Sequence, residues 1–332
     1  MLKNKTLIVY GSRPEFLKVK PIFGKVAADT LHIGQHTNII DFGNPTHYIP
    51  IDAEDGEGRL NKILSEISLK APAVFKNYDR IIVQGDTASV FGAAVVAFHM
   101  QKQIIHLEAG LRSYNLKSPF SEEGYRQMVS RIATVHLCPT AYSAEILKRE
   151  NVEGKIHVVG NTILDNLVGV VPHYGNKVLV TIHRQENREK IVEILKEVDD
   201  AARENPELEF IFPVHPNPTF LNAARSVKNI TITSALEHNK LIEILSSCRF
   251  IISDSGGIFE EGSFLGKKTI ILRDHTERSE GIMSGHGTLC PIDKIKKEID
   301  WHAKGKNHEI YIPCPFGDGF AVDKIKKILE NV

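Results

Sequence analysis

Short apolar runs alternate with amphipathic stretches along almost the whole chain. Continuous apolar runs are typical of strands buried on both faces, whereas the longer amphipathic stretches favour helices. The predicted strands form two series, 6–10, 80–84, 103–107, 135–138 and 156–159, then 177–182, 209–214, 230–233, 249–253 and 269–272. Helices are predicted over 16–27, 89–99, 141–150, 190–204 and 241–247. Strands that alternate with helices predict parallel sheets covered on both faces.

The two series predict an α/β protein with two Rossmann-like, doubly wound domains. The segment 172–176, with the sequence PHYGN, is the best candidate for a linker. We therefore expect domains over 1–172 and 173–320. Ligands of such sheets bind outside the carboxyl ends of the strands, so two facing domains would place the active site in the interdomain cleft.

Composition narrows the class of protein. The chain has 332 residues, of which 42% are hydrophobic and 25% are charged, as in soluble proteins of about two domains. The 41 basic residues balance the 41 acidic residues, so we expect no nucleic acid partner. Neither a membrane-spanning run nor a signal peptide is evident, so we expect no membrane partner. Four scattered cysteines without a Cys-x-x-Cys pair predict a reducing, cytoplasmic location.

The strongest candidate chemistry lies at the end of the predicted strand 249–253. Ser255, Gly256 and Gly257 follow this strand, and Glu260 and Glu261 follow in a helix-like segment that we expect to start there. Glycines at a strand-to-helix turn let backbone N–H groups approach an anion, and a helix N-terminus favours negative charge. Adjacent glutamates suit the hydroxyls of a ribose, so the segment predicts a nucleotide site. The alternative is a tight turn in which Ser255 only caps the helix.

Further polar residues follow other predicted strands, where parallel strands would bring them to one edge. In the first half Arg13 and Lys18 could neutralise a phosphate, although Pro14 suits any helix start and a lysine on a helix is usually solvated. Three carboxylates are further candidates; they are Asp86, Glu108 and Glu122. Asp86 could instead cap a helix and Glu122 suits any helix start, whereas Glu108 at the end of a buried strand is costly unless it is used or paired. Three carboxylates at neighbouring strand ends would repel one another without a task, which favours a functional role for the set.

In the second half His183 and Arg184 follow a strand, and we expect His183 to donate to a pyrophosphate, although a lone histidine is more often structural. His215, in the sequence HPNP, favours a rigid loop. Metal-ligand spacing, a Gly-x-Gly-x-x-Gly motif and a Walker loop are all missing from the sequence. We therefore expect no metal and neither a nicotinamide nor an ATP cofactor.

Taken in order, these motifs resemble the non-hydrolysing UDP-N-acetylglucosamine 2-epimerases from Gly11 to about Ala321. The matching segments are GSRPEFLK (11–18), GQH (34–36), GDTAS (85–89), HLEAGLRS (106–113), SPFSEE (118–123), GNT (160–162), VTIHRQEN (180–187), HPNP (215–218), SDSGG with EE (253–261), TERSE (276–280) and FGDG (316–319). Each motif alone is weak, whereas the ordered set is highly specific.

The resemblance implies the glycosyltransferase-B arrangement, with a C-terminal helix over 321–332 that returns to the first domain, and a homodimer. It implies a UDP-sugar substrate and interconversion of UDP-GlcNAc with UDP-ManNAc, without a cofactor. The implied catalytic residues are Arg13, Lys18, Asp86, Glu108, Glu122 and His183. The implied substrate and UDP-binding residues are Arg13, His183, Ser255, Gly256, Gly257, Glu261 and Arg278.

The chemistry accounts for these residue types. The C2–H of the sugar is removable only as the C1–O bond breaks, so the site has to stabilise departing UDP and supply a carboxylate for the proton. The family mechanism is elimination to 2-acetamidoglucal and UDP, followed by re-addition. The roles of Asp86, Glu108 and Glu122 within that scheme stay open.

The sequence also departs from the family pattern. Gln84 replaces a frequent histidine, Phe259 a frequent glutamine and Leu241 an aromatic residue near the nucleobase, while Ser121 replaces a proline. The segment after His36 is short, so we do not expect a second, activating UDP-GlcNAc. The substituted positions also leave a related UDP-N-acetyl-6-deoxyhexosamine open as an alternative substrate.

Three other functions are alternatives to that of a non-hydrolysing epimerase. A hydrolysing epimerase typically has Gly-Gly after the glutamate, where this chain has Ala109 and Gly110. A glycosyltransferase needs an acceptor site that the sequence does not identify. A nucleotide-sugar sensor would not need all six active-site matches.

Overall fold

The computed structural model describes residues 4–34, 43–52, 56, 58–305 and 312–332. Contacts divide the chain into two compact units, one of Met1–Asn166 with Gly317–Val332 and one of Leu167–Phe316. Each unit contains one parallel sheet, which confirms the predicted α/β class with two doubly wound sheets. The predicted domain bounds of 1–172, 173–320 and 321–332 stay predictions. The segment after His36 begins outside the described residues.

The first unit is built on a seven-stranded sheet in which all strands are parallel. The strand order is β3 (His47–Pro50), β2 (Asp29–Gly34), β1 (Thr6–Tyr10), β4 (Arg80–Gln84), β5 (Gln103–Leu107), β6 (Val135–Cys138) and β7 (Lys155–Val158). The chain winds outward in both directions from β1 and β4, so the topological switch point lies between these two strands.

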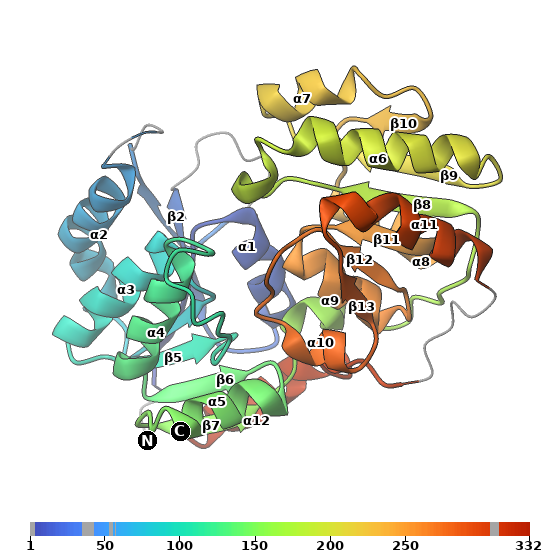
Figure 1. Cartoon of the computed structure of the whole chain (residues 1–332). Helices are drawn as coiled ribbons and strands as arrows, with labels where there is room; N and C mark the ends of the chain where they lie inside the picture. Colours follow the sequence, from blue (N-terminus) through green and yellow to red (C-terminus); the bar gives the residue numbers. More distant parts are fainter. Residues whose placement is uncertain (1–3, 35–42, 53–55, 57, 306–311) are drawn as a thin grey trace. The chain divides into compact units, whose positions relative to one another are not determined.

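Helices cover both faces of this sheet (Figure 1). One face packs against α2 (Arg59–Phe75), α3 (Ala88–His99), α4 (Glu122–Ile132) and α5 (Ala141–Arg149). The other face packs against α1 (Arg13–Val19) and α12 (Ala321–Glu330). Asp165 fixes the start of α12, because its carboxylate accepts the backbone N–H groups of Ala321 and Val322 at 3.1 and 2.9 Å. The last helix therefore belongs to the first unit.

The second unit is built on a six-stranded parallel sheet. Its order is β10 (Ile230–Thr233), β9 (Glu209–Pro213), β8 (Lys177–Thr181), β11 (Cys248–Ser253), β12 (Thr269–Ile271) and β13 (Gly287–Leu289). One face packs against α6 (Ile191–Glu204), α7 (Pro218–Ala224) and α11 (Ile295–Lys304). The helices α8 (His238–Ser247) and α9 (Gly256–Phe264) contact β8, β11 and β12, and α10 (Ser279–Met283) precedes β13 (Figure 1). The switch point lies between β8 and β11.

Each predicted strand is present within one residue at either end. Strands β2, β3 and β13 were not predicted, because β3 and β13 are short edge strands and β2 mixes polar with apolar residues. The predicted helix 16–27 is wrong at both ends. Ser12 and Glu15 form a capping box that starts α1 at Arg13, and the helix gives way at Pro21 to a 3-10 turn, Lys20–Ile22.

Candidate functional site

Polar residues follow the carboxyl ends of the central strands in both units. In the first unit Arg13 lies after β1, Asp86 after β4 and Glu108 after β5; in the second, His183 lies after β8 and Ser255 after β11. Strands β1 and β4 flank one switch point and β8 and β11 the other, where doubly wound proteins bind their ligands, and β5 lies next to β4. The expectation that the polar clusters sit at the same ends of the strands is thus confirmed within each sheet.

Glu108 is held from two sides in the first unit. Its Oε1 forms an ion pair with Lys18 Nζ, and its Oε2 accepts a hydrogen bond of 2.5 Å from Gln84 Nε2. The side chains of Lys18 and Glu108 are 11% and 8% exposed, so Lys18 is not a solvated lysine on a helix surface. Glu108 also has a left-handed backbone with φ of 66°, a conformation that non-glycine residues adopt at a cost and that clusters at functional sites.

Asp86 is paired rather than used as a helix cap. Its carboxylate lies 2.5 Å from Arg126 Nη2, and the residue at the N-cap of α3 is Thr87. Arg126 also contacts Glu123 at 3.3 Å. Glu123 is fully buried and accepts the backbone N–H groups of Ser113 and Tyr114 at 2.9 and 3.1 Å. Asp86 is thereby connected to α4 and to the loop before it.

Two predicted residues stand at helix starts. Glu122 is the first residue of α4, as expected, and Arg13 is the first residue of α1. A carboxylate at this position is favoured by the helix dipole, whereas an arginine is not. Stabilisation of the helix start therefore explains the position of Glu122. It does not explain the position of Arg13, which points to another role.

Glu15, which was not among the predicted site residues, organises the start of α1. Its Oε2 accepts the backbone N–H groups of Gly11 and Ser12 at 2.5 and 3.0 Å. Burial raises the pKa of Glu15 from its ordinary 4.5 to about 7, although the hydrogen bonds from the backbone N–H groups of Gly11 and Ser12 oppose the shift. The signal that could have found this residue is the Ser-x-x-Glu spacing of a capping box.

Asp254 is the organising carboxylate of the second unit and was likewise not selected as a site residue. It is fully buried, and it accepts the backbone N–H groups of His183 and Arg184 at 3.1 and 2.9 Å and Asn187 Nδ2 at 2.9 Å. The His183 Nδ1 lies 3.7 Å from the same carboxylate. Partial burial lowers the pKa of His183, although the negative charge of Asp254 acts to raise it. The loop after β8 is thereby fixed to the end of β11.

His215 has the structural role that was expected of it. Its Nδ1 accepts the backbone N–H of Asn217 at 3.2 Å, within the loop that leads into α7. Its ring also stacks on that of His183, with centroids 6.5 Å apart, and meets Phe220 edge-on.

Helix α9 starts at Gly256, so the expectation that it starts at Glu260 is wrong. Ser255 is the N-cap, and its side chain accepts the backbone N–H of Ile258 at 3.5 Å. Both glycines therefore lie in the first turn, where their N–H groups have no partner within the helix. A Cβ on Gly257 would meet no atom within 4 Å, whereas one on Gly256 would overlap the guanidinium of Arg278.

Arg278 is buried between two carboxylates. Its Nε donates to Glu260 Oε1 at 2.6 Å, and its Nη1 pairs with Glu277. Glu277 also pairs with Arg273 at 3.0 Å. Arg278 is thus held beside the first turn of α9, where its predicted contact with a phosphate stays a prediction.

Glu261, the predicted ribose contact, lies one turn into α9. Its Oε1 is 2.6 Å from Nε2 of His238, the first residue of α8. The two side chains are 4% and 14% exposed. His238 is a partner that the sequence analysis missed, because it comes from another helix.

Phe259, which replaces a glutamine of the family pattern, is a core residue. Its ring is 2% exposed and meets the ring of Phe316 edge-on at 5.5 Å. Gly281 and Gly287 leave room for this ring, because a Cβ on either would collide with it. Leu241, the other replacement, is partly buried in α8.

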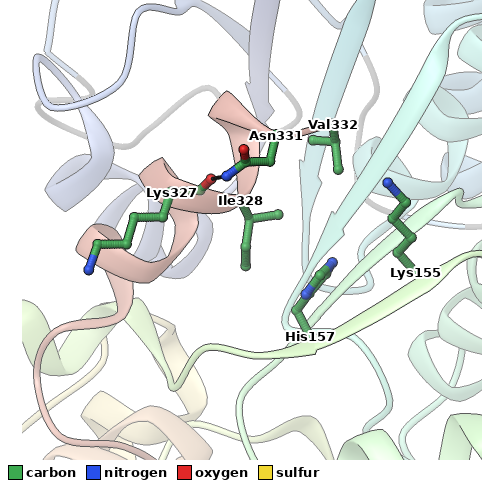
Figure 2. A pocket seen from close by; sticks show the side chains of 6 residues that line it. All are labelled: Lys155, His157, Lys327, Ile328, Asn331 and Val332. Atoms are coloured by element: carbon green, nitrogen blue, oxygen red, sulfur yellow. Dashed lines mark hydrogen bonds between the residues drawn. The ribbon is translucent and has the colours of Figure 1, made fainter.

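A separate cavity of about 250 Å³ lies beside β7 and α12. It is lined by Lys155, His157, Lys327, Ile328, Asn331 and Val332 (Figure 2). None of the predicted site residues lines it, so we assign it no part in the site.

Within the described ranges, no helix is long and apolar enough to cross a membrane. Nor do three or more His, Cys, Asp or Glu side chains gather there as a metal site would require.

The fold and these strand-end groups define an α/β protein of the doubly wound class. The family model described as UDP-N-acetylglucosamine 2-epimerase matches residues 24–330. A protein named UDP-N-acetylglucosamine 2-epimerase from Campylobacter jejuni is 32% identical, over 98% of this chain and 97% of its own. The chain therefore belongs to the UDP-N-acetylglucosamine 2-epimerase family, which confirms the predicted family and enzyme class, an isomerase.

Solved structures agree with this assignment. A putative UDP-N-acetylglucosamine 2-epimerase from Listeria monocytogenes has a TM-score of 0.92 at 29% identity, covering 100% of this chain and 98% of its own. The UDP-GlcNAc 2-epimerase from Neisseria meningitidis, solved with UDP-GlcNAc bound, has a TM-score of 0.88 at 28% identity, with 99% and 100% covered.

The buried Glu15 generates a prediction about stability. Its pKa is raised in the folded state, so between pH 4.5 and 7 the unfolded chain loses this proton while the folded chain keeps it. This group therefore lowers the free energy of unfolding as the pH rises. Glu15→Gln keeps the acceptor oxygen and cannot ionise, so it should gain on the order of 3 kcal/mol over wild type between pH 4.5 and 8.

Urea denaturation across this pH range measures the difference. Glu153→Gln, at an exposed position before β7, is the matched control and should give no such gain. A difference between Glu15→Gln and wild type that does not change with pH would contradict the assignment.

Proposed function

We propose that the protein is a non-hydrolysing UDP-N-acetylglucosamine 2-epimerase that interconverts UDP-GlcNAc and UDP-ManNAc. The reaction is the elimination of UDP to give 2-acetamidoglucal, followed by re-addition of UDP. The observation that carries the proposal is the paired, largely buried Glu108, held at the strand ends of a chain that belongs to this family.

In the second unit, the residues at the start of α9 are proposed to bind the leaving group. The first turn of α9 offers the N–H groups of Gly256 and Gly257, and the open space at Gly257 admits a close anion. His183, fixed by Asp254, is a further donor for the diphosphate. A phosphate contact of Arg13 rests on the family resemblance alone. Ser255 and Arg278 shape the start of the helix, and Glu261 contacts the ribose.

The groups proposed to take and return the proton come from the first unit. The C2–H bond breaks as the C1–O bond electrons leave with UDP, so a carboxylate has to lie at C2 when positive charge develops on the sugar. Glu108, oriented by Lys18, is the candidate for this role that the geometry favours. Asp86 and Glu122 are the candidates to return a proton on the other face. This division of roles needs no cofactor and no metal.

The non-hydrolysing subtype is supported by the residues after Glu108. Ala109 is fully buried with Cys138, Ala144 and Leu147, where the hydrolysing branch typically has glycine. A homodimer remains part of the proposal on the family resemblance alone. The cytoplasmic location remains part of the proposal on the composition of the sequence alone.

Incubation with UDP-GlcNAc in D₂O, followed by NMR, tests the proposal. We expect UDP-ManNAc to form with deuterium at C2. Free ManNAc would instead establish the hydrolysing reaction. Binding of UDP-GlcNAc without turnover would reject the proposed activity, and UDP-N-acetyl-6-deoxyhexosamines would then be assayed in the same way.

Glu108→Gln should abolish deuterium exchange at C2, because the amide cannot accept the proton, while UDP binding survives in the second unit. Calorimetry with UDP and NMR in D₂O measure the two properties separately. Glu145→Gln, at an exposed position on α5, is the matched control and should exchange at the wild-type rate. Wild-type exchange in Glu108→Gln would disprove its role.

The two glycines in the first turn of α9 give a second prediction. Gly257→Ala meets no atom of the protein, so its thermal stability should be kept or raised, whereas its affinity for UDP should fall about tenfold or more because the methyl group takes the place of the anion. Gly256→Ala displaces Arg278 and should lower the melting temperature. Calorimetry with UDP and thermal unfolding measure both effects; equal UDP affinity in Gly257→Ala and wild type would exclude this phosphate position.

A further inference from the structure

Gln84 is a buried polar residue that the chemistry described so far does not use. It is the last residue of β4 and is 1% exposed. Its Nε2 donates to Glu108 Oε2 at 2.5 Å, while Lys18 takes the other carboxylate oxygen. Both oxygens of Glu108 are therefore contacted by donors, and these two donors come from different elements, α1 and β4.

The orientation of the Gln84 amide is determined by the carboxylate. If the amide were rotated by 180°, its oxygen would face Oε2 of Glu108, and two acceptors would oppose each other. In the observed orientation the Oε1 of Gln84 is buried and has no hydrogen-bond partner among the residues that the structure describes. An acceptor left unpaired in the interior is destabilising, which favours a functional reason for the donor on the same group.

The backbone around this contact is fixed as well. Gly85, with φ of 83°, donates its N–H to the carbonyl of Leu107 at 3.0 Å, and its own carbonyl lies 2.8 Å from His106 Nε2. These bonds join the end of β4, where Gln84 lies, to the end of β5, which Glu108 directly follows. A residue in a costly conformation, such as Glu108, persists only where its surroundings hold it in this way.

We propose that Gln84 is a positioning residue for Glu108 in the proton transfer. The inference rests on the proposed function, in which a Glu108 oxygen takes the C2 proton, the C2–H electrons form the C1–C2 double bond and the C1–O electrons leave with UDP. Lys18 alone could hold one oxygen and leave the carboxylate free to rotate about it. Gln84 fixes the second oxygen with a donor that adds no further charge, and so sets the plane of the carboxylate.

Two substitutions at Gln84 separate positioning from packing. Gln84→Leu removes the donor, and the rate of C2 exchange in D₂O at saturating UDP-GlcNAc should fall about 10- to 100-fold with little change in KM. Gln84→Glu is nearly isosteric but brings two carboxylates together, which share a proton only at low pH. The ratio of its rate to the wild-type rate should therefore rise as the pH is lowered from 8 to 6.

The other charged or titratable groups around this pair are present in wild type and variant alike, so the ratio isolates the new carboxylate. They are Lys18 and Glu15 on α1, Asp86 after β4, His106 on β5 and Arg126 on α4. Gln103→Leu makes the same chemical change at the opposite end of the adjacent strand β5 and should keep the wild-type rate.

The outcomes distinguish failure of the proposed function from failure of the positioning role of Gln84. Absence of C2 exchange in wild type would reject the proposed function itself. Exchange in wild type together with wild-type rates in both Gln84 variants would overturn the positioning role only. If Gln84→Leu does not fold, the pH dependence of Gln84→Glu decides alone: a constant ratio to wild type overturns the role, and a ratio that rises towards pH 6 supports it.

Discussion

The structure depends on the pairing of charged groups that are buried at the carboxyl ends of parallel strands. A charge taken out of water without a partner costs several kcal/mol, so a partner has to be present for each. Glu108 has Lys18, Asp86 has Arg126, and Asp254 has the backbone N–H groups of the loop after β8. Because the partners come from different helices and loops, the same pairs that neutralise these charges also fix the geometry of the strand ends.

The two units meet this constraint in different ways. In the first, carboxylates are paired with cationic side chains, and the result is a set of oriented groups that suits proton transfer. In the second, Asp254 is satisfied largely by N–H donors, and helix α9 begins with two glycines whose N–H groups suit an anion. Elimination of UDP requires both kinds of group, because a base has to take the C2 proton while the C1–O electrons leave with the diphosphate.

The parts of this arrangement that the sequence predicted are those with local signals. Each of the strands 6–10, 80–84 and 103–107 contains an apolar run, and the residues after the last two gave Asp86 and Glu108. Arg126, Gln84 and His238 were not selected, because each acts through a contact with a residue far away in sequence. Phe259 had no local signal for burial either, since the room for its ring comes from glycines after α9.

The central claim is that these strand-end groups break the C1–O bond of the UDP-sugar reversibly. Positional isotope exchange tests it most directly, with UDP-GlcNAc that carries ¹⁸O in the bridge between C1 and the β-phosphorus. We predict that the label moves into the non-bridging β-phosphate oxygens as UDP-ManNAc forms, because the phosphate of released UDP rotates before re-addition. Formation of UDP-ManNAc with the label retained in the bridge would contradict the account.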